Sequence, residues 1–230
     1  MSAAAPSVST GVDETADALD RRLRFVLELD RLKGVLRRTR LLDGSRHENS
    51  AEHSWHLALM AVLLADGAGP GVDLLRVLQM VLVHDVVEID AGDTFCYDPG
   101  ANLDRTGRER LAADRLFGLL PEPQGSGLRG VWEEFEAGES ADARFAVALD
   151  RMQPLLLNFH SGGGSWREHG VTRAQVLARM APIERGAPQL WPLVLRTIDQ
   201  ACALGQIAPD PDVCRGVNVL RREGGRWPTG

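Results

Sequence analysis

Ionisable side chains interrupt the most apolar helical segments of this chain. One histidine lies on the apolar face of a segment at about 51–66, a His-Asp pair interrupts 72–89, and an aspartate lies within 140–160. Segments of this kind belong in a protein core, where an ionised carboxylate is costly unless it is paired or binds a metal. We therefore expect these polar side chains to meet inside the fold. They are His53, His84, Asp85 and Asp150.

Helical periodicity recurs along the chain, and no alternating strand pattern of useful length appears. The first helix is expected from about Asp13 to Arg40, so that it closes on the arginine-rich stretch 37–40. Ser50 is a plausible N-cap for the next helix, whose stretch 57–65 is apolar nearly all round and is expected in the middle of a bundle. The other helices are expected at about 72–89, 103–120, 128–137, 140–160, 172–180 and 187–204.

These segments predict an all-α fold, a single-domain helical bundle at 14–205. Residues 1–13 are small and polar and are expected to be disordered. Residues 206–230 are rich in Pro, Gly and Arg and are expected to form an extended C-terminal tail.

Composition narrows the class of protein. The 230 residues carry a formal charge of −6, which argues against binding a nucleic acid polymer through a general basic surface. No apolar run is long enough to cross a membrane, and residues 1–13 lack the features of a signal peptide. An odd number of cysteines without CxxC spacing fits a reducing cytoplasm. They are Cys96, Cys202 and Cys214.

Two imidazoles and two carboxylates form a mixed nitrogen and oxygen set that suits a divalent cation. Ligand type alone does not choose between Mn, Co, Fe, Ni, Zn and Mg. Taken singly, such a histidine is usually a hydrogen-bonded core residue and such an aspartate a helix cap. Asp85 is harder to dismiss, because it lies in mid-helix next to His84 with valines on both sides. The combination favours one metal site, whose bound water would become a nucleophile near neutral pH.

The order of these residues resembles the H…HD…D signature of the HD-domain phosphohydrolases. The stretch Glu48-Asn49-Ser50-Ala51-Glu52-His53-Ser54 and the pattern HDxxExxxGD at 84–93 are similar to one small branch, the bacterial 5′-deoxynucleotidases and their HD-domain-containing relatives. The resemblance covers roughly 15–205. It implies a helical bundle that often dimerises, so a homodimer is expected, and one divalent metal held by His53, His84, Asp85 and Asp150.

The resemblance also suggests residues for chemistry and for phosphate binding. Glu88 shares a helical face with His84 and Asp85 and is expected to act as an acid or base beside the metal site, although an ordinary polar residue near a helix end is an alternative. The residue matching Asp93 is associated with catalysis and phosphate-site organisation in the family, although a turn residue after Gly92 is an alternative. Arg38 is the best match by spacing to an arginine that contacts the substrate phosphate, although cations at a helix C-terminus also complement its dipole.

The expected function is removal of phosphate from a small phosphomonoester such as a (deoxy)nucleoside 5′-monophosphate. Thr39 stands where some deoxynucleotidases have tryptophan, so deoxyribose preference does not follow. Two-metal HD enzymes need further histidines between the HD pair and the last aspartate, and this chain has none between Asp85 and Asp150. The alternatives are a non-catalytic HD-fold protein that binds a metal or nucleotide or regulates a partner, and a phosphatase for a non-nucleotide metabolite.

Overall fold

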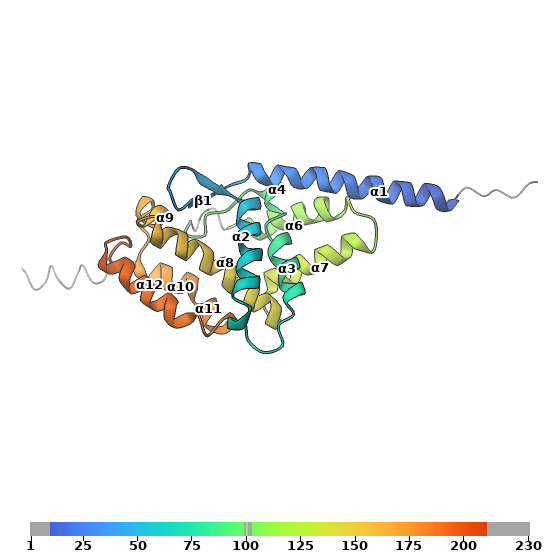
Figure 1. Cartoon of the computed structure of the whole chain (residues 1–230). Coiled ribbons are helices and arrows are strands. Elements are labelled where there is room, and N and C mark those ends of the chain that lie inside the picture. Colours follow the sequence, from blue (N-terminus) through green and yellow to red (C-terminus); the bar gives the residue numbers. More distant parts are fainter. Residues whose placement is uncertain (1–9, 99, 101–102, 211–230) are drawn as a thin grey trace, which may run out of the picture.

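Helix α8 (Ala141–His160) runs through the middle of the bundle, and helices from both halves of the chain pack against it (Figure 1). It begins at the N-cap Ser140, whose hydroxyl accepts a hydrogen bond from the backbone of Ala143. Buried residues occur along its whole length, and Asp150 is one of them. The central position of this helix brings a carboxylate into the core, as the apolar pattern predicted.

The computed structural model describes residues 10–98, 100 and 103–210, and helices dominate them, which confirms the all-α class. Three short elements are the 3-10 helices η1 and η2 and a two-stranded antiparallel sheet. In chain order the elements before α8 are α1 (Thr10–Leu29), η1 (Asp30–Gly34), β1 (Leu36–Arg40), β2 (His47–Asn49), α2 (Ser50–Leu63), η2 (Ala65–Gly67), α3 (Leu74–Val83), α4 (Glu88–Ala91), α6 (Arg105–Phe117) and α7 (Gln124–Ala137). Those after it are α9 (Gly164–Glu168), α10 (Arg173–Met180), α11 (Pro182–Gly186) and α12 (Trp191–Ala203).

The expected chain ends fall partly outside the described residues. Helix α1 begins at Thr10, three residues before the expected start, while residues 1–9 are not described. Of the expected tail, Ala208 forms a parallel bridge with Thr172, and its backbone N–H bonds the carbonyl of Val171. Residues 211–230 lie outside the described part, so an extended tail there remains a prediction.

Buried apolar side chains form two clusters that meet near the His-Asp pair. The larger cluster joins α2, α3, α8 and the C-terminal helices, and it includes Met80 and Val81. The smaller cluster joins α1, η1, α6 and part of α7, and it includes Val86 and Val87. His84 and Asp85 therefore lie where the chain passes from one cluster into the other, at a boundary that leaves room for a cavity.

The expectation of one helix from 13 to 40 is wrong. The helical region ends at Gly34, Val35 is extended, and the next residues pair as strand β1 with β2. Leu36 faces Asn49 and Arg40 faces His47 in this ladder. Pairing with a segment further along the chain overrides helix propensity here, which local periodicity does not reveal. The arginine-rich stretch thus lies on a strand, with side chains alternating between two faces.

The expectation of a continuous helix over 72–89 is also wrong. Helix α3 ends at Val83, residues 84–87 form tight turns, and α4 begins at Glu88. The N–H of Val86 bonds the carbonyl of Val83, so the spacing shortens from four residues to three. This change of pitch carries Val86 and Val87 into the second cluster while His84 and Asp85 face the cavity.

Asn49, rather than Ser50, caps α2. The Asn49 side chain accepts from the Glu52 backbone, and the Glu52 carboxylate accepts from the Asn49 backbone in a capping box. The helix ends at Leu63 instead of 66. Ser50 is fully buried, and its hydroxyl is not used in capping the helix.

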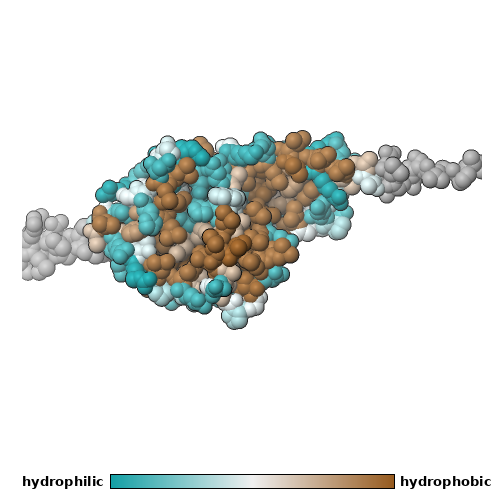
Figure 2. All heavy atoms as spheres, viewed as in Figure 1, coloured by the Kyte–Doolittle hydropathy of each residue, from teal (hydrophilic) through white to brown (hydrophobic). Residues whose placement is uncertain are grey.

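One face of α2 is exposed, so the expectation that this helix lies in the middle of a bundle is wrong for the single chain. Trp55 is 62% exposed and Leu63 is 78% exposed. Figure 2 shows apolar residues gathered into a broad patch over α2 and α3. The exposed large apolar side chains on these two helices are Trp55, Leu59, Val62, Leu63, Leu75 and Leu82.

Candidate metal centre

The His84 imidazole is held with one nitrogen aimed at the cluster. Its Nδ1 lies 3.0 Å from the carbonyl oxygen of Val81, one turn back. A carbonyl only accepts, so Nδ1 carries the proton and Nε2 keeps its lone pair. Nε2 is buried without a hydrogen-bond partner among the described residues and lies 3.0 Å from Asp85 Oδ1. Burial lowers the pKa of His84, which favours this neutral, ligating form.

His53 and Asp150 meet from helices α2 and α8. His53 is completely buried, and its Nε2 lies 3.0 Å from Asp150 Oδ1. The same aspartate oxygen lies 3.8 Å from His84 Nε2. Although burial opposes ionisation, Arg151 and His53 hold the pKa of Asp150 well below its ordinary value. The carboxylate is therefore negatively charged in the core.

The spacing of these donor atoms fits a bound cation. Ligand atoms of His53, His84 and Asp150 all lie within 4.8 Å of one another, and Asp85 joins through its contact with His84. Ligands about 2.1 Å from a first-row ion lie about 3.0 Å apart in an octahedron and about 3.4 Å apart in a tetrahedron. The observed separations of 3.0 and 3.8 Å span these values. His84 Nε2 adds a lone pair that no hydrogen bond occupies, so the residues present fit a divalent cation.

Glu48 lies behind His53, and Gln153 holds Glu48 in place. Glu48 is buried, and its Oε2 lies 3.6 Å from His53 Nδ1. Gln153 donates a 2.6 Å hydrogen bond to the other Glu48 oxygen. A carboxylate behind a ligating imidazole selects its tautomer and makes it a better ligand. Glu48 belongs to the motif noted in the sequence, but no role was predicted for it.

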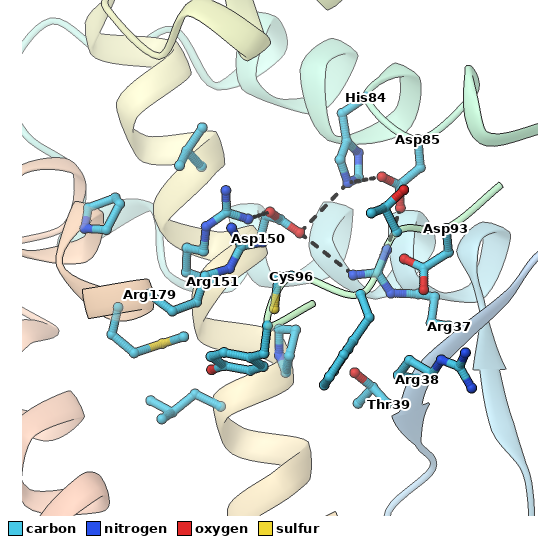
Figure 3. Close-up of a pocket in the computed structure, with 18 of the residues that line it drawn as sticks. Arg37, Arg38, Thr39, His84, Asp85, Asp93, Cys96, Asp150, Arg151 and Arg179 are labelled. Atoms are coloured by element: carbon cyan, nitrogen blue, oxygen red, sulfur yellow. Dashed lines mark hydrogen bonds and ion pairs between the residues drawn. The ribbon is translucent and has the colours of Figure 1, made fainter. Parts of the chain in front are cut away.

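Arg37 contacts the cluster directly, and sequence reasoning missed it. Its Nη1 lies 2.7 Å from Asp85 Oδ2, and its Nη2 lies 4.0 Å from Asp150 Oδ1 (Figure 3). Burial opposes its charge, yet Asp85 and the neighbouring acids raise the pKa of Arg37, so it stays ionised. Strand alternation is the signal that finds it, because Arg37 and Thr39 face inward on β1 while Arg38 is exposed.

Glu88 lies beside the cluster with one oxygen already held. Ser50 Oγ donates a 2.6 Å hydrogen bond to Glu88 Oε2, and both residues are buried. Burial, followed by the charge of Asp85, raises the pKa of Glu88 well above its ordinary value. The raised pKa favours the protonated form of this carboxyl group.

A cavity of about 630 Å³ opens onto the cluster. His84, Asp85, Glu88 and Asp150 line it, as do the predicted residues Arg38 and Asp93. Figure 3 shows the Arg37 guanidinium pointing toward the carboxylates, while Arg38 points away from them. Burial raises the pKa of Asp93, which lies beside the Arg37 side chain (Figure 3). The volume accommodates a small organic molecule.

A protein-family model described as "HD domain" matches residues 29–191, which include the whole cluster. The chain belongs to the HD domain family. Within that family, the human 5′-deoxynucleotidase HDDC2 is 30% identical over 138 residues. This match covers 58% of the present chain and 66% of the human protein, just under two thirds of its length. A fission yeast protein named 5′-deoxynucleotidase hdd1 is 22% identical over 139 residues, or 57% of the present chain and 67% of its own.

A solved structure resembles this HD domain over nearly the full length of the solved chain. It is titled a predicted metal-dependent phosphohydrolase from Magnetospirillum magnetotacticum, and it is 52% identical with a TM-score of 0.81. The match covers 84% of the present chain and 97% of that chain.

Among the described residues, no helix has the length and apolar character needed to cross a membrane.

Proposed function

We propose that this HD-domain protein is a metal-dependent phosphohydrolase that removes phosphate from a (deoxy)nucleoside 5′-monophosphate. The observation that carries the proposal is the buried His84 Nε2, which has no hydrogen-bond partner in the described chain and lies beside two carboxylates at the floor of a cavity. The names of the relatives support a phosphomonoesterase acting on a nucleotide. Such chemistry is feasible because the site has residues that can hold a metal, contact a phosphate and transfer a proton.

His53, His84, Asp85 and Asp150 would hold one divalent cation. When bound there, the cation would acidify a water molecule and neutralise charge on the phosphoryl group. Arg37 already lies among these acids, so its fork is placed to contact phosphoryl oxygens next to them. Arg38, at the exposed side of the same cavity, is proposed to attract the phosphate as it enters.

Glu88 is proposed to deliver a proton to the departing ester oxygen. Its raised pKa keeps the proton available, and Ser50 holds one carboxyl oxygen so that the other is turned for transfer. As the water oxygen forms a new bond to phosphorus, the P–O bond to the ester oxygen breaks. The departing alkoxide takes the proton of Glu88, and the proton released by the attacking water passes to the phosphate product or to solvent. Asp93 faces Arg37 and Arg38 and is proposed to organise their side chains around the phosphate.

The deciding experiment measures inorganic phosphate released from ribo- and deoxyribonucleoside 5′-monophosphates, with Mn²⁺, Co²⁺, Fe²⁺, Ni²⁺, Zn²⁺ and Mg²⁺ in turn. We expect release with at least one cation and none after chelation. A panel that includes sugar phosphates separates a nucleotidase from a phosphatase for another metabolite. A protein that binds metal but releases no phosphate from any substrate would be a non-catalytic HD scaffold, contrary to the proposal.

We also propose that a second copy of the chain covers the apolar face of α2 and α3. Exposed residues on α2 recur at helical spacing and form one continuous stripe, of which Leu63 is the most exposed. Patches of this kind on soluble proteins commonly mark interfaces. Light scattering should give twice the chain mass for the wild type and the chain mass for Leu63→Glu; a monomeric wild type would contradict this. A cytoplasmic location, expected from the cysteines, remains a prediction.

A further inference from the structure

A second pair of arginines lies on the far side of Asp150 from Arg37. Arg151 comes from α8 and Arg179 from α10, and both line the cavity. Figure 3 shows them together on the opposite side of Asp150 from Arg37 and Arg38. Arg179 is near enough to Arg151 for their like charges to repel each other. The cavity therefore has a cationic group at each end, with the metal cluster between them.

The acids that pair with Arg151 and Arg179 are too few to neutralise both positive charges. The Arg151 side chain is 17% exposed, and its ion-pair partner is Asp150, a proposed metal ligand. Arg179 has no ion-pair or hydrogen-bond partner within the described residues. Arg105, which also lines the cavity, already pairs with Glu109 and Glu136. Two adjacent guanidinium groups in a partly buried site are unfavourable unless an anion joins them.

The apolar part of the cavity lining suits an organic molecule. Tyr97, Pro154 and Trp166 contribute apolar walls, and the cavity of about 630 Å³ exceeds what a single phosphate needs. The reacting phosphate has Arg37 and Arg38 at the other end. A charge on Arg179 is therefore available to a different part of the same ligand.

We propose that the cavity takes phosphomonoesters that carry a second anionic group, which Arg151 and Arg179 bind together. This inference rests on the proposed phosphohydrolase function and specifies its substrate class. The second group is a phosphate or a carboxylate, and both accept paired hydrogen bonds from guanidinium groups. The reaction at the first phosphate is unchanged, because the second group contributes binding only.

Two matched ligand pairs test the proposal. Deoxyadenosine 5′-monophosphate is compared with deoxyadenosine 3′,5′-bisphosphate, and uridine 5′-monophosphate with orotidine 5′-monophosphate, which adds a carboxylate. Calorimetry measures the dissociation constant of each for the full chain. We expect at least one of the ligands with a second anionic group to bind about tenfold more tightly than its partner, as charge-assisted contacts allow. The pair that shows the preference identifies the group.

Arg179→Ala should abolish this preference, measured as the ratio of the two dissociation constants, and Arg179→Lys should retain part of it. Arg173→Ala is the matched control, because Arg173 lies on the same helix but pairs with Asp199 outside the cavity. Equal affinities within both pairs for the wild type, or a preference that survives in Arg179→Ala, would overturn the proposal. Binding needs no turnover, so absence of phosphate release would refute the proposed function without hiding this result.

Discussion

Ser50 Oγ donates a 2.6 Å hydrogen bond to Glu88 Oε2, joining the first turn of α2 to the first turn of α4. The contact is possible because Asn49 caps α2 and leaves the serine hydroxyl free. We predict that Ser50→Ala lowers kcat about threefold to tenfold with little change in KM, since a lost hydrogen bond between neutral groups is worth about 1 kcal/mol. Steady-state kinetics with one nucleotide measures both, and an unchanged kcat would show that the bond does not position Glu88.

Glu88→Gln should keep the metal and lose most turnover. Glutamine preserves the shape of the side chain but has no proton to transfer, which costs about 10²–10⁴-fold in rate. Metal content by elemental analysis and phosphate release at saturating metal measure the two effects separately. The exposed Glu184→Gln serves as the control. Near wild-type turnover in Glu88→Gln would leave Glu88 with a structural role alone.

Glu48→Gln should weaken metal binding by about 10–100-fold, the usual effect of losing a carboxylate behind a ligating histidine. The Glu48 carboxylate lies 3.6 Å from His53 Nδ1, and the amide would present no negative charge there. Titration with Mn²⁺ or Co²⁺ measures the affinity, with the exposed Glu139→Gln as a charge-matched control. Equal affinities for wild type and Glu48→Gln would contradict the orienting role.

Replacing each of the three arginines of β1 should affect the kinetic constants differently. Arg38→Ala should raise KM about tenfold, with Arg38→Lys intermediate, because a single ammonium replaces a bidentate fork. Arg37→Ala should lower both kcat/KM and metal content, since it leaves buried Asp85 without its 2.7 Å partner. Arg40→Ala should be nearly silent, because Arg40 pairs with Glu168 away from the cavity. Identical kinetics for all three variants would remove the proposed phosphate contacts.

Metal should stabilise the fold through its ligands. A cation at 100 times its dissociation constant adds about 2.7 kcal/mol to the free energy of unfolding, and chelation removes it. We expect Tm to rise with metal in the wild type and in the exposed control Asp199→Asn, which is 63% exposed. His53→Ala and Asp150→Asn should show no rise. A metal-induced rise of wild-type size in both ligand variants would place the cation elsewhere.

The apolar pattern by itself determined that His53, His84, Asp85 and Asp150 are core residues. Buried charge is costly wherever it occurs, so polar side chains in apolar helices had to share a partner. The helical class and the limits of α8 followed from periodicity as well, within a residue of the observed Ala141–His160. Glu88 was found because its distance along the chain from His84 and Asp85 is short.

Tertiary structure alone decided which arginine reaches the cluster. The resemblance to the family favoured Arg38 by its spacing before His53, but strand pairing with 47–49 imposes a period of two, which turns Arg37 inward. Long-range contacts likewise decided the roles of Ser50 and Glu48, whose partners lie 38 and 105 residues away. A local pattern records which side chains avoid water. It does not record which segments, distant in sequence, will supply their hydrogen bonds, because that depends on how helices and strands pack.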